Sequence, residues 1–189
     1  MMRSLNKRMA GYSLLEVMIA AVVLSLGLLG LVALQTQSKF ATYEARQRTL
    51  ASWLANDMVE RVRINQGSWG ATGTVTVNLA ANLPLPSCAN ANGHLAGCST
   101  ADLRSADLHY WQQALLGAAV TGAGSSLLTP VGCVVRRAND VLAIAIFWAG
   151  RQPIADGATA TEAATIINEC QLDNSDNLTR RQFILTTTL

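Results

Sequence analysis

Two histidines and four cysteines are the residues of this sequence best suited to metal or covalent chemistry. Cys88, His94, Cys98 and His109 lie close together in the chain, and thiolates and imidazoles are preferred ligands of Zn²⁺. Their Cys-x5-His-x3-Cys spacing is looser than the Cys-x2-4-Cys pairs of structural zinc sites. No Ser-His-Asp arrangement and no phosphate-cradling glycine loop accompanies them. The sequence therefore predicts no enzyme, no metal centre and no cofactor.

A second unusual group is the carboxylate of Glu16, which stands at the start of a long apolar run. Residues 17–34 carry no charge, and as a helix they would reach about 27 Å, close to the thickness of a bilayer's hydrocarbon core. A carboxylate at mid-membrane costs roughly 2.5–3.5 kcal/mol, and less near the edge where Glu16 would lie. The run predicts a membrane-spanning helix, and Glu16 needs a purpose that offsets its cost.

The residues before the run complete a motif. A leader with three basic residues ends at Gly11, and Tyr12-Ser13-Leu14-Leu15-Glu16 follows. This order resembles the class III signal peptides of type IV pilins and type II secretion pseudopilins. The resemblance implies that a prepilin peptidase cuts between Gly11 and Tyr12 and methylates the new amine of Tyr12. It also implies that Glu16 pairs with such an amine and sets the register of assembling subunits.

An ordinary secretory signal is the alternative for this segment. Its small-residue cleavage site would follow the apolar core, whereas Gly11 precedes it. Tyr12 stands where the pilins usually have Phe, at a position that accepts an aromatic or apolar residue. Neither a secretory signal nor a plain membrane anchor explains Glu16.

Charge and composition indicate the compartment. The leader holds three of the 14 basic residues and none of the 12 acidic ones, so the processed chain has a net charge of −1 and no basic face for nucleic acid. Charged residues make up 14% of the chain, below the ~25% usual for soluble domains. The basic leader favours the cytoplasmic side. We therefore expect a single-pass inner-membrane protein whose C-terminal part lies in the periplasm.

Export makes the four cysteines candidates for disulfide bonds, because the periplasm is oxidising and their number is even. Of three possible pairings, we expect Cys88–Cys98 and Cys133–Cys170. The first would close a loop that lacks other structure. The second, which the resemblance to minor pilins suggests, would tie a hairpin to the C-terminal region.

The apolar helix is expected to continue past the membrane, because residues 35–66 contain neither proline nor glycine. Leu54, Met58 and Val62 recur there every four residues, as is typical of an amphipathic helix. Gly67 follows at the position of a C-cap. The predicted organisation is a removed leader at 1–11, a transmembrane assembly helix at 12–34, its amphipathic continuation at 35–66 and a periplasmic globular α+β domain at 67–189.

The remaining patterns predict short strands and one further helix. Ser99 and the residues after it are typical of a helix start, and Asn139-Asp140 separates two apolar runs as a hairpin turn would. The expected elements are strands at 74–79, 132–137, 141–148, 166–172 and 181–189 and a helix at 100–116. Residues 141–148 are apolar on both faces, which favours a central strand between the helix and partner chains. The core is expected to hold Trp53, Trp69, Trp111 and Trp148.

The fold class is therefore α+β, with a long N-terminal helix packed on an antiparallel sheet of about four strands. The resemblance identifies this as the pilin fold. Segments 27–35, 55–65 and 146–151 also resemble minor pilins of the PilV type, the type IV pilus modification proteins.

The resemblance implies a minor pilin that is incorporated in the pilus tip or primes its assembly. The pilus could serve twitching motility, adhesion or DNA uptake, and the sequence does not distinguish among these. Its implied partners are other minor pilins, the major pilin, the prepilin peptidase and a large tip adhesin. A type II secretion minor pseudopilin is the alternative, because it shares the N-terminal motif. A membrane-anchored periplasmic enzyme or metal-binding module is a more distant one.

Overall fold

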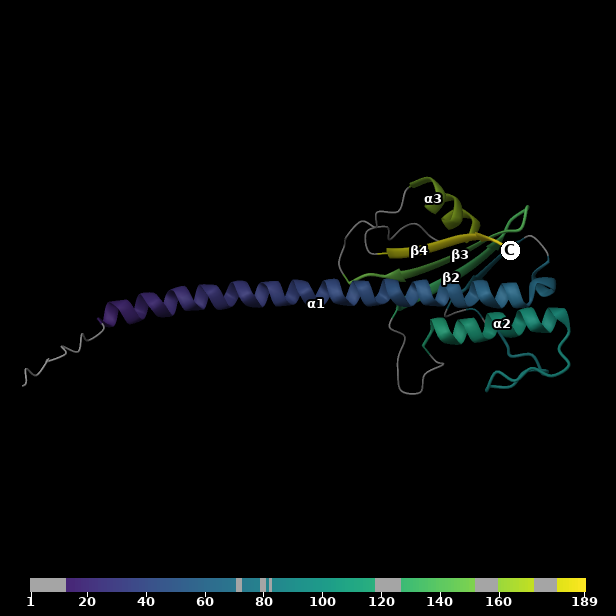
Figure 1. Cartoon of the computed structure of the whole chain (residues 1–189), viewed down its shortest axis with the longest axis horizontal. Helices are drawn as coiled ribbons and strands as arrows, with labels where there is room; N and C mark the ends of the chain where they lie inside the picture. Colours follow the sequence, from purple (N-terminus) through teal and green to yellow (C-terminus); the bar gives the residue numbers. More distant parts are fainter. Residues whose placement is uncertain are drawn as a thin grey trace, which may run out of the picture. The chain divides into compact units, whose positions relative to one another are not determined.

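The computed structural model describes residues 13–70, 73–78, 81, 83–117, 127–151, 160–171 and 180–189, with the backbone alone at 160–163. Its elements, in chain order, are α1 (Leu14–Ile64), the 3-10 helix η1 (Gln66–Trp69), β1 (Gly73–Val77), α2 (Thr100–Leu115), β2 (Leu128–Arg136), β3 (Val141–Ala149), α3 (Ala160–Glu169) and β4 (Arg180–Thr188) (Figure 1). The chain divides into two compact units, residues 1–43 and 44–189.

Helix α1 runs for 51 residues, in agreement with the uninterrupted pattern of the sequence. The prediction of Gly67 as its C-cap is wrong. The helix ends at Ile64, and the chain tightens into η1, where the Ser68 amide donates to the Asn65 carbonyl oxygen at 2.8 Å. Gly67 lies inside this 3-10 turn without a positive φ, so the turn does not depend on glycine.

The four strands form one antiparallel sheet in the order β1-β2-β3-β4. The predicted hairpin is present as β2 and β3. Asn139 and Asp140 turn it with φ of 64° and 57°, a left-handed backbone that Asn and Asp tolerate better than most residues. Strand β3 is central and buried along both faces, as its apolar sequence predicts.

One face of the sheet packs against α2 and the part of α1 that follows Tyr43. The apolar side chains of this core come from all three elements: Leu54, Met58 and Val62 of α1, Leu108, Trp111 and Leu115 of α2, and Leu142, Ile144, Ile146 and Trp148 of β3. Two buried indoles keep a hydrogen bond here. Trp111 Nε1 donates to the Leu54 carbonyl oxygen at 2.9 Å, and Trp148 Nε1 donates to Gln47 Oε1 at 3.2 Å.

Gly132 allows α2 to approach β2 closely. A Cβ at this position would lie 2.4 Å from Cη2 of Trp111 and 2.7 Å from Cδ1 of Leu115. The Trp111 indole could not move aside for such a Cβ, because it is a rigid ring that is fully buried. The absence of a side chain on β2 therefore makes room for the largest core residue of α2.

The opposite face of the sheet is covered by α3, which overturns the predicted strand at 166–172 (Figure 1). Ile166 and Cys170 are four residues apart, and the Cys170 amide donates to the Ile166 carbonyl oxygen at 2.8 Å. Both side chains are buried against Ala143, Ala145 and Phe147 of β3. The β-branched residues suggested a strand, but i,i+4 burial and the alanine-rich sequence before them stabilise a helix. This chain therefore covers for itself the face that was expected to meet partner chains.

Helix α2 agrees with the predicted helix at 100–116. Ser99 forms a capping box: its hydroxyl accepts from the Asp102 amide at 3.2 Å, and Asp102 Oδ2 accepts from the Ser99 amide at 3.2 Å. Gly117, with φ of 74°, follows the C-cap. Strands β1 and β4 also agree with the predicted strands at 74–79 and 181–189, within two residues at each end.

Candidate functional site

The first half of α1 carries a continuous apolar surface. Every large apolar side chain from Leu14 to Leu34 is at least 52% exposed. The most apolar window of α1 has a mean hydropathy of 2.8 with none of its residues buried, and among the described residues α1 is the one helix that could cross a membrane. Being fully exposed, this segment is not the core helix of a soluble domain. Its surface is consistent with anchoring in a membrane.

Two hydroxyl groups in the first half of α1 are satisfied by the helix itself. The Ser25 hydroxyl donates to the Ala21 carbonyl oxygen at 2.7 Å, and the Thr36 hydroxyl donates to the Val32 carbonyl oxygen at 2.9 Å. Such i−4 bonds remove the need for water or a partner chain. The segment can therefore enter an apolar environment with little cost from its hydroxyls.

Glu16 is the exception. It lies in the first turn of α1, where the Glu16 amide donates to the Ser13 carbonyl oxygen at 2.9 Å and the helix dipole favours a negative charge. No side chain among the described residues is hydrogen-bonded to its carboxylate. The expected cleavage and methylation site, Gly11 and Tyr12, lies outside the described residues.

Gly27 and Gly30 lie within the apolar segment, and a Cβ at either position would meet no atom within 4 Å. Within the part of the chain that the structure describes, their smallness therefore serves no packing contact. Two sequence-based explanations stay open: a local weakening of the helix, or room for a neighbouring helix to approach.

The four cysteines form two disulfide bonds, and these are the expected pairs. Cys88 and Cys98 are joined across ten residues in the loop before α2, and Cys133 of β2 is joined to Cys170, which follows α3. The second bond ties the β2–β3 hairpin to the C-terminal region, as expected, although Cys170 follows a helix there and does not lie in the predicted strand. The Thr76 hydroxyl also donates to the Cys170 carbonyl oxygen at 3.0 Å.

Three of the four possible metal ligands are engaged elsewhere. Cys88 and Cys98 are bonded to each other, and His109 Nδ1 contacts the Leu83 carbonyl oxygen at 2.5 Å. Across the described ranges, no three His, Cys, Asp or Glu side chains are grouped as a metal site would require.

Asp107 is a buried carboxylate that the sequence analysis did not single out. Its Oδ2 accepts from Asn65 Nδ2 at 2.8 Å and from Trp69 Nε1 at 3.4 Å, and Arg61 Nη1 lies 4.0 Å from its Oδ1. Burial raises the pKa of the Asp107 carboxyl above its ordinary value of 3.8, and these three partners offset part of the rise. The carboxylate therefore joins α1, η1 and α2 at the edge of the core.

A signal for this group exists in the sequence. Asp107 precedes Trp111 by four residues, so the two share a face of α2, and that face is apolar. Two ion pairs offered no such signal because their partners are distant in sequence. Arg181 Nε donates to Glu44 Oε2 at 3.2 Å, and Arg137 Nη2 donates to Glu169 Oε2 at 2.8 Å.

Trp53 was expected in the core and is exposed. Its side chain is 62% accessible, whereas the other three tryptophans are at most 2% accessible. The residues buried on the same helix, Leu54 and Met58, show that Trp53 lies just outside the apolar stripe.

A long N-terminal helix with an exposed apolar half, packed through its second half on a four-stranded antiparallel sheet, defines an α+β fold of the pilin type. Family comparison agrees with this class. Residues 33–109 match the family described as type IV pilin Tt1218, and residues 6–32 match the prokaryotic N-terminal methylation motif. The two matches adjoin each other and support a type IV pilin or a related pseudopilin.

No curated protein and no solved structure matches the chain. A pilin assignment suggests a structural subunit rather than an enzyme. The methylation motif, which includes Gly11, Tyr12 and Glu16, implies a substrate of the prepilin peptidase.

Proposed function

We propose that this protein is a minor pilin of the PilV type, which is incorporated in or primes the tip of a type IV pilus. The observation that carries the proposal is the union of the methylation motif with an exposed apolar helix on a pilin fold. Priming requires one subunit to present an assembly surface before a filament exists. The apolar half of α1 is such a surface, since the rest of the described chain does not cover its large side chains.

The proposed pathway begins with cleavage between Gly11 and Tyr12 and methylation of Tyr12. The new N-terminal ammonium would stand four residues before Glu16 in the sequence, a separation of about one turn in a helix. A carboxylate and an ammonium attract strongly where the dielectric constant is low, and leaving either unpaired there is costly. Pairing between Glu16 of one subunit and the amine of its neighbour would fix the axial register of the two helices.

We propose the matching topology for the whole chain. The leader at 1–11 is removed in the cytoplasm, 12–34 cross the inner membrane, 35–66 continue the helix, and 67–189 form the periplasmic domain. The two disulfide bonds support this placement because an oxidising compartment maintains them. The partners would be other minor pilins, the major pilin and a tip adhesin.

Intact-mass analysis of the chain purified from membranes tests the processing step. The expected mass is that of residues 12–189 with two disulfide bonds and one added methyl group. A Gly11→Val variant should keep the leader, because a side chain at this position would obstruct the peptidase. A mature N-terminus beyond the apolar run would contradict the proposal.

A chromosomal deletion tests the assembly role and separates it from secretion. Surface pili should fall severely in the deletion strain and return when the gene is restored. A type II secretion pseudopilin is favoured instead if pili are unchanged while secreted enzymes accumulate in the periplasm.

A further inference from the structure

A cleft opens where the second half of α1 meets α2 and the loop at 83–98. Its volume is about 710 Å³, within the range of roughly 300–1,000 Å³ that is usual for small-molecule sites. Its walls carry aromatic, amide and charged side chains together: Trp53, Asp57 and Arg61 from α1, Tyr110 and Gln113 from α2, and Asn92 and Leu95 from the loop. All of these residues belong to the second compact unit.

Trp53 supplies the cleft with a broad apolar ring face. Trp53, Asp57 and Arg61 are spaced by four residues, so they follow one another along one side of α1. The indole is 62% exposed, and Leu95 of the loop, also in the cleft wall, is 39% exposed. The ring face of Trp53 is therefore available to stack against a ligand in the cleft.

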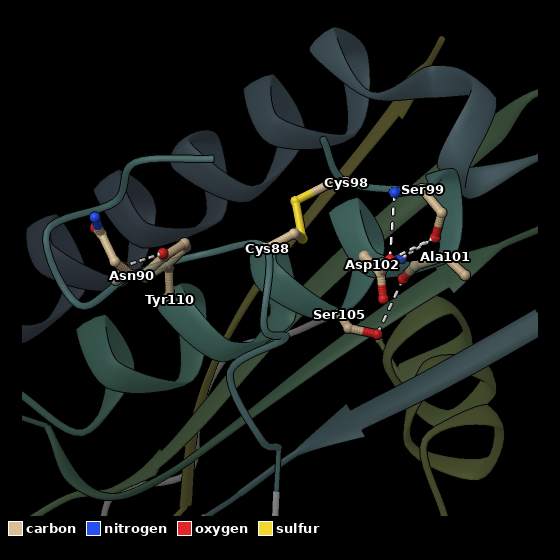
Figure 2. The surroundings of a disulfide bond; sticks show 8 residues. All are labelled: Cys88, Asn90, Cys98, Ser99, Ala101, Asp102, Ser105 and Tyr110. Atoms are coloured by element: carbon tan, nitrogen blue, oxygen red, sulfur yellow. Dashed lines mark hydrogen bonds between the residues drawn. A yellow bond between two sulfur atoms is a disulfide. The ribbon is translucent and has the colours of Figure 1, made fainter. Parts of the chain in front are cut away.

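The loop wall is held in shape before any ligand arrives. The Cys88–Cys98 bond closes it, and the Tyr110 hydroxyl donates to the Asn90 carbonyl oxygen at 2.6 Å (Figure 2). Asn90 Oδ1 accepts from the backbone amides of Asn92 and His94 at 3.0 and 3.1 Å. Because these bonds order the loop within the chain, binding would not have to order it.

The solvent-facing charges of the cleft form one pair, Arg61 with Asp57. The second carboxylate, Asp107, is buried and accepts hydrogen bonds from Asn65 and Trp69. Arg61 Nε donates to Asp57 Oδ2 at 2.9 Å, and Arg61 Nη1 lies 4.0 Å from Asp107 Oδ1. A phosphate would meet two aspartates beside the arginine, and an ammonium would meet the arginine itself. A purely apolar ligand would cover these groups and leave them without water. The lining therefore favours a ligand that is uncharged, rich in hydrogen-bonding groups and apolar on one face.

We propose that this cleft binds a neutral saccharide, with one sugar ring stacked on Trp53. The C–H face of a pyranose ring is apolar and flat enough to cover an indole, while its hydroxyls both donate and accept. The Asp57 carboxylate can accept hydrogen bonds from sugar hydroxyls, and the Arg61 guanidinium can donate hydrogen bonds to hydroxyl oxygens. The side-chain amides of Asn92 and Gln113 can both donate and accept. The proposal rests on these residues alone and does not depend on the role in pilus assembly.

Saturation-transfer NMR on the full-length chain tests the proposal. The protein is held in a detergent without a sugar headgroup, since a maltoside would compete. The probes are glucose, galactose, mannose, N-acetylglucosamine and their disaccharides at millimolar concentration, with glucose 6-phosphate as the charged comparison. At least one neutral sugar should receive saturation on its ring protons, and the phosphate should weaken binding.

Substitutions of Trp53 test whether the saturation-transfer signal comes from binding in the cleft. Trp53→Ala should weaken the affinity roughly tenfold or more, and Trp53→Phe, which keeps a ring, should lose less. Ile64→Ala is the matched control, because Ile64 is an 80% exposed apolar residue of α1 that does not line the cleft. Near-ultraviolet circular dichroism verifies that each variant is folded.

Three results would overturn the proposal. One is the absence of saturation transfer to every neutral sugar, and another is a signal that persists unchanged in Trp53→Ala. The third is an efficient cross-link to a protein when benzoylphenylalanine replaces Trp53 in cells, which would make the cleft a protein interface.

Discussion

Asp107 couples the stability of the core edge to pH. Because burial raises the pKa of its carboxyl above 3.8, the native state holds this proton more tightly than the unfolded state does. The resulting stabilisation is fully present below pH 3.8 and is lost as the pH rises through the raised value. Above that value the fold must accommodate a buried negative charge, which Asn65, Trp69 and Arg61 offset among the described residues.

Asp107→Asn should remove this pH dependence. The new amide oxygen can accept both existing hydrogen bonds without carrying a charge, so the variant should match or exceed the wild-type stability at neutral pH. Thermal or urea unfolding between pH 3.5 and 7.5 measures how the unfolding free energy of each protein depends on pH. Glu60→Gln, which removes an exposed carboxylate from α1, is the control and should leave the slope unchanged. A wild-type slope that survives in Asp107→Asn would refute the assignment.

Gly132 sets how closely α2 can approach β2. Gly132→Ala would place a methyl group 2.4 Å from Trp111, and this overpacking should cost about 1–3 kcal/mol of unfolding free energy. Gly67→Ala is the matched control, because a Cβ there meets nothing within 4 Å and the φ is ordinary, so the change should stay within about 0.5 kcal/mol. An equally small loss of unfolding free energy in both variants would contradict this expectation, because it would show that α2 can move away from β2 at no cost.

At the scale of elements, the two disulfide bonds should differ in what they stabilise. The Cys133–Cys170 bond spans 37 residues and the Cys88–Cys98 bond spans ten. Chain-entropy estimates give about 3.8 kcal/mol for the longer loop and about 2.7 kcal/mol for the shorter one. Each bond can be removed by replacing both of its cysteines with alanine. Urea unfolding should then show a larger loss of unfolding free energy for the Cys133 and Cys170 variant than for the Cys88 and Cys98 variant.

Hydrogen exchange separates the local consequences of the two losses. Without the longer bond, amides of α3 should lose protection while those of β3 keep theirs, because β3 remains paired with β2 and β4. Loss of the shorter bond should affect only the loop at 88–98. Uniform loss of protection across the domain in either variant would contradict a local role.

The elements that were predicted from sequence have local causes. The hairpin follows from Asn139 and Asp140, and α2 follows from the capping box at Ser99 and the stop at Gly117. Helix α3 was misassigned because Ile166 and Ile167 favour a strand by propensity, and only the buried face of the sheet makes them helical. The local pattern does not contain that information.

The candidate functional residues likewise include some that the sequence reveals and some that only the fold reveals. The Gly11, Tyr12 and Glu16 motif is contiguous, so the sequence alone locates it. The cleft around Trp53 joins α1 to a loop some forty residues away, and the exposure of Trp53 depends on which side of α1 meets the sheet. Residues next to one another on a helix, such as Trp53 and Leu54, can lie on opposite sides of that boundary.

At the scale of the whole molecule, the proposed function makes Glu16 the determinant of assembly. Glu16→Gln keeps the size and hydrogen-bonding capacity of the side chain but removes the charge that would pair with the Tyr12 amine. The variant should still be cleaved, inserted and folded, because Glu16 belongs to the first compact unit, whereas the core and both disulfide bonds belong to the second. Surface pili should nevertheless fall at least several-fold when Glu16→Gln replaces the chromosomal copy.

Counting pili by electron microscopy, with membrane levels measured in parallel, checks this expectation. Glu60→Gln on the same helix is the matched control, since it removes one exposed carboxylate that pairs only with nearby Arg63 among the described residues. Normal piliation in Glu16→Gln and in the deletion strain alike would exclude a required priming role. Pili that are lost in the deletion strain but normal in Glu16→Gln would keep the priming role and discard the charge pairing as its mechanism.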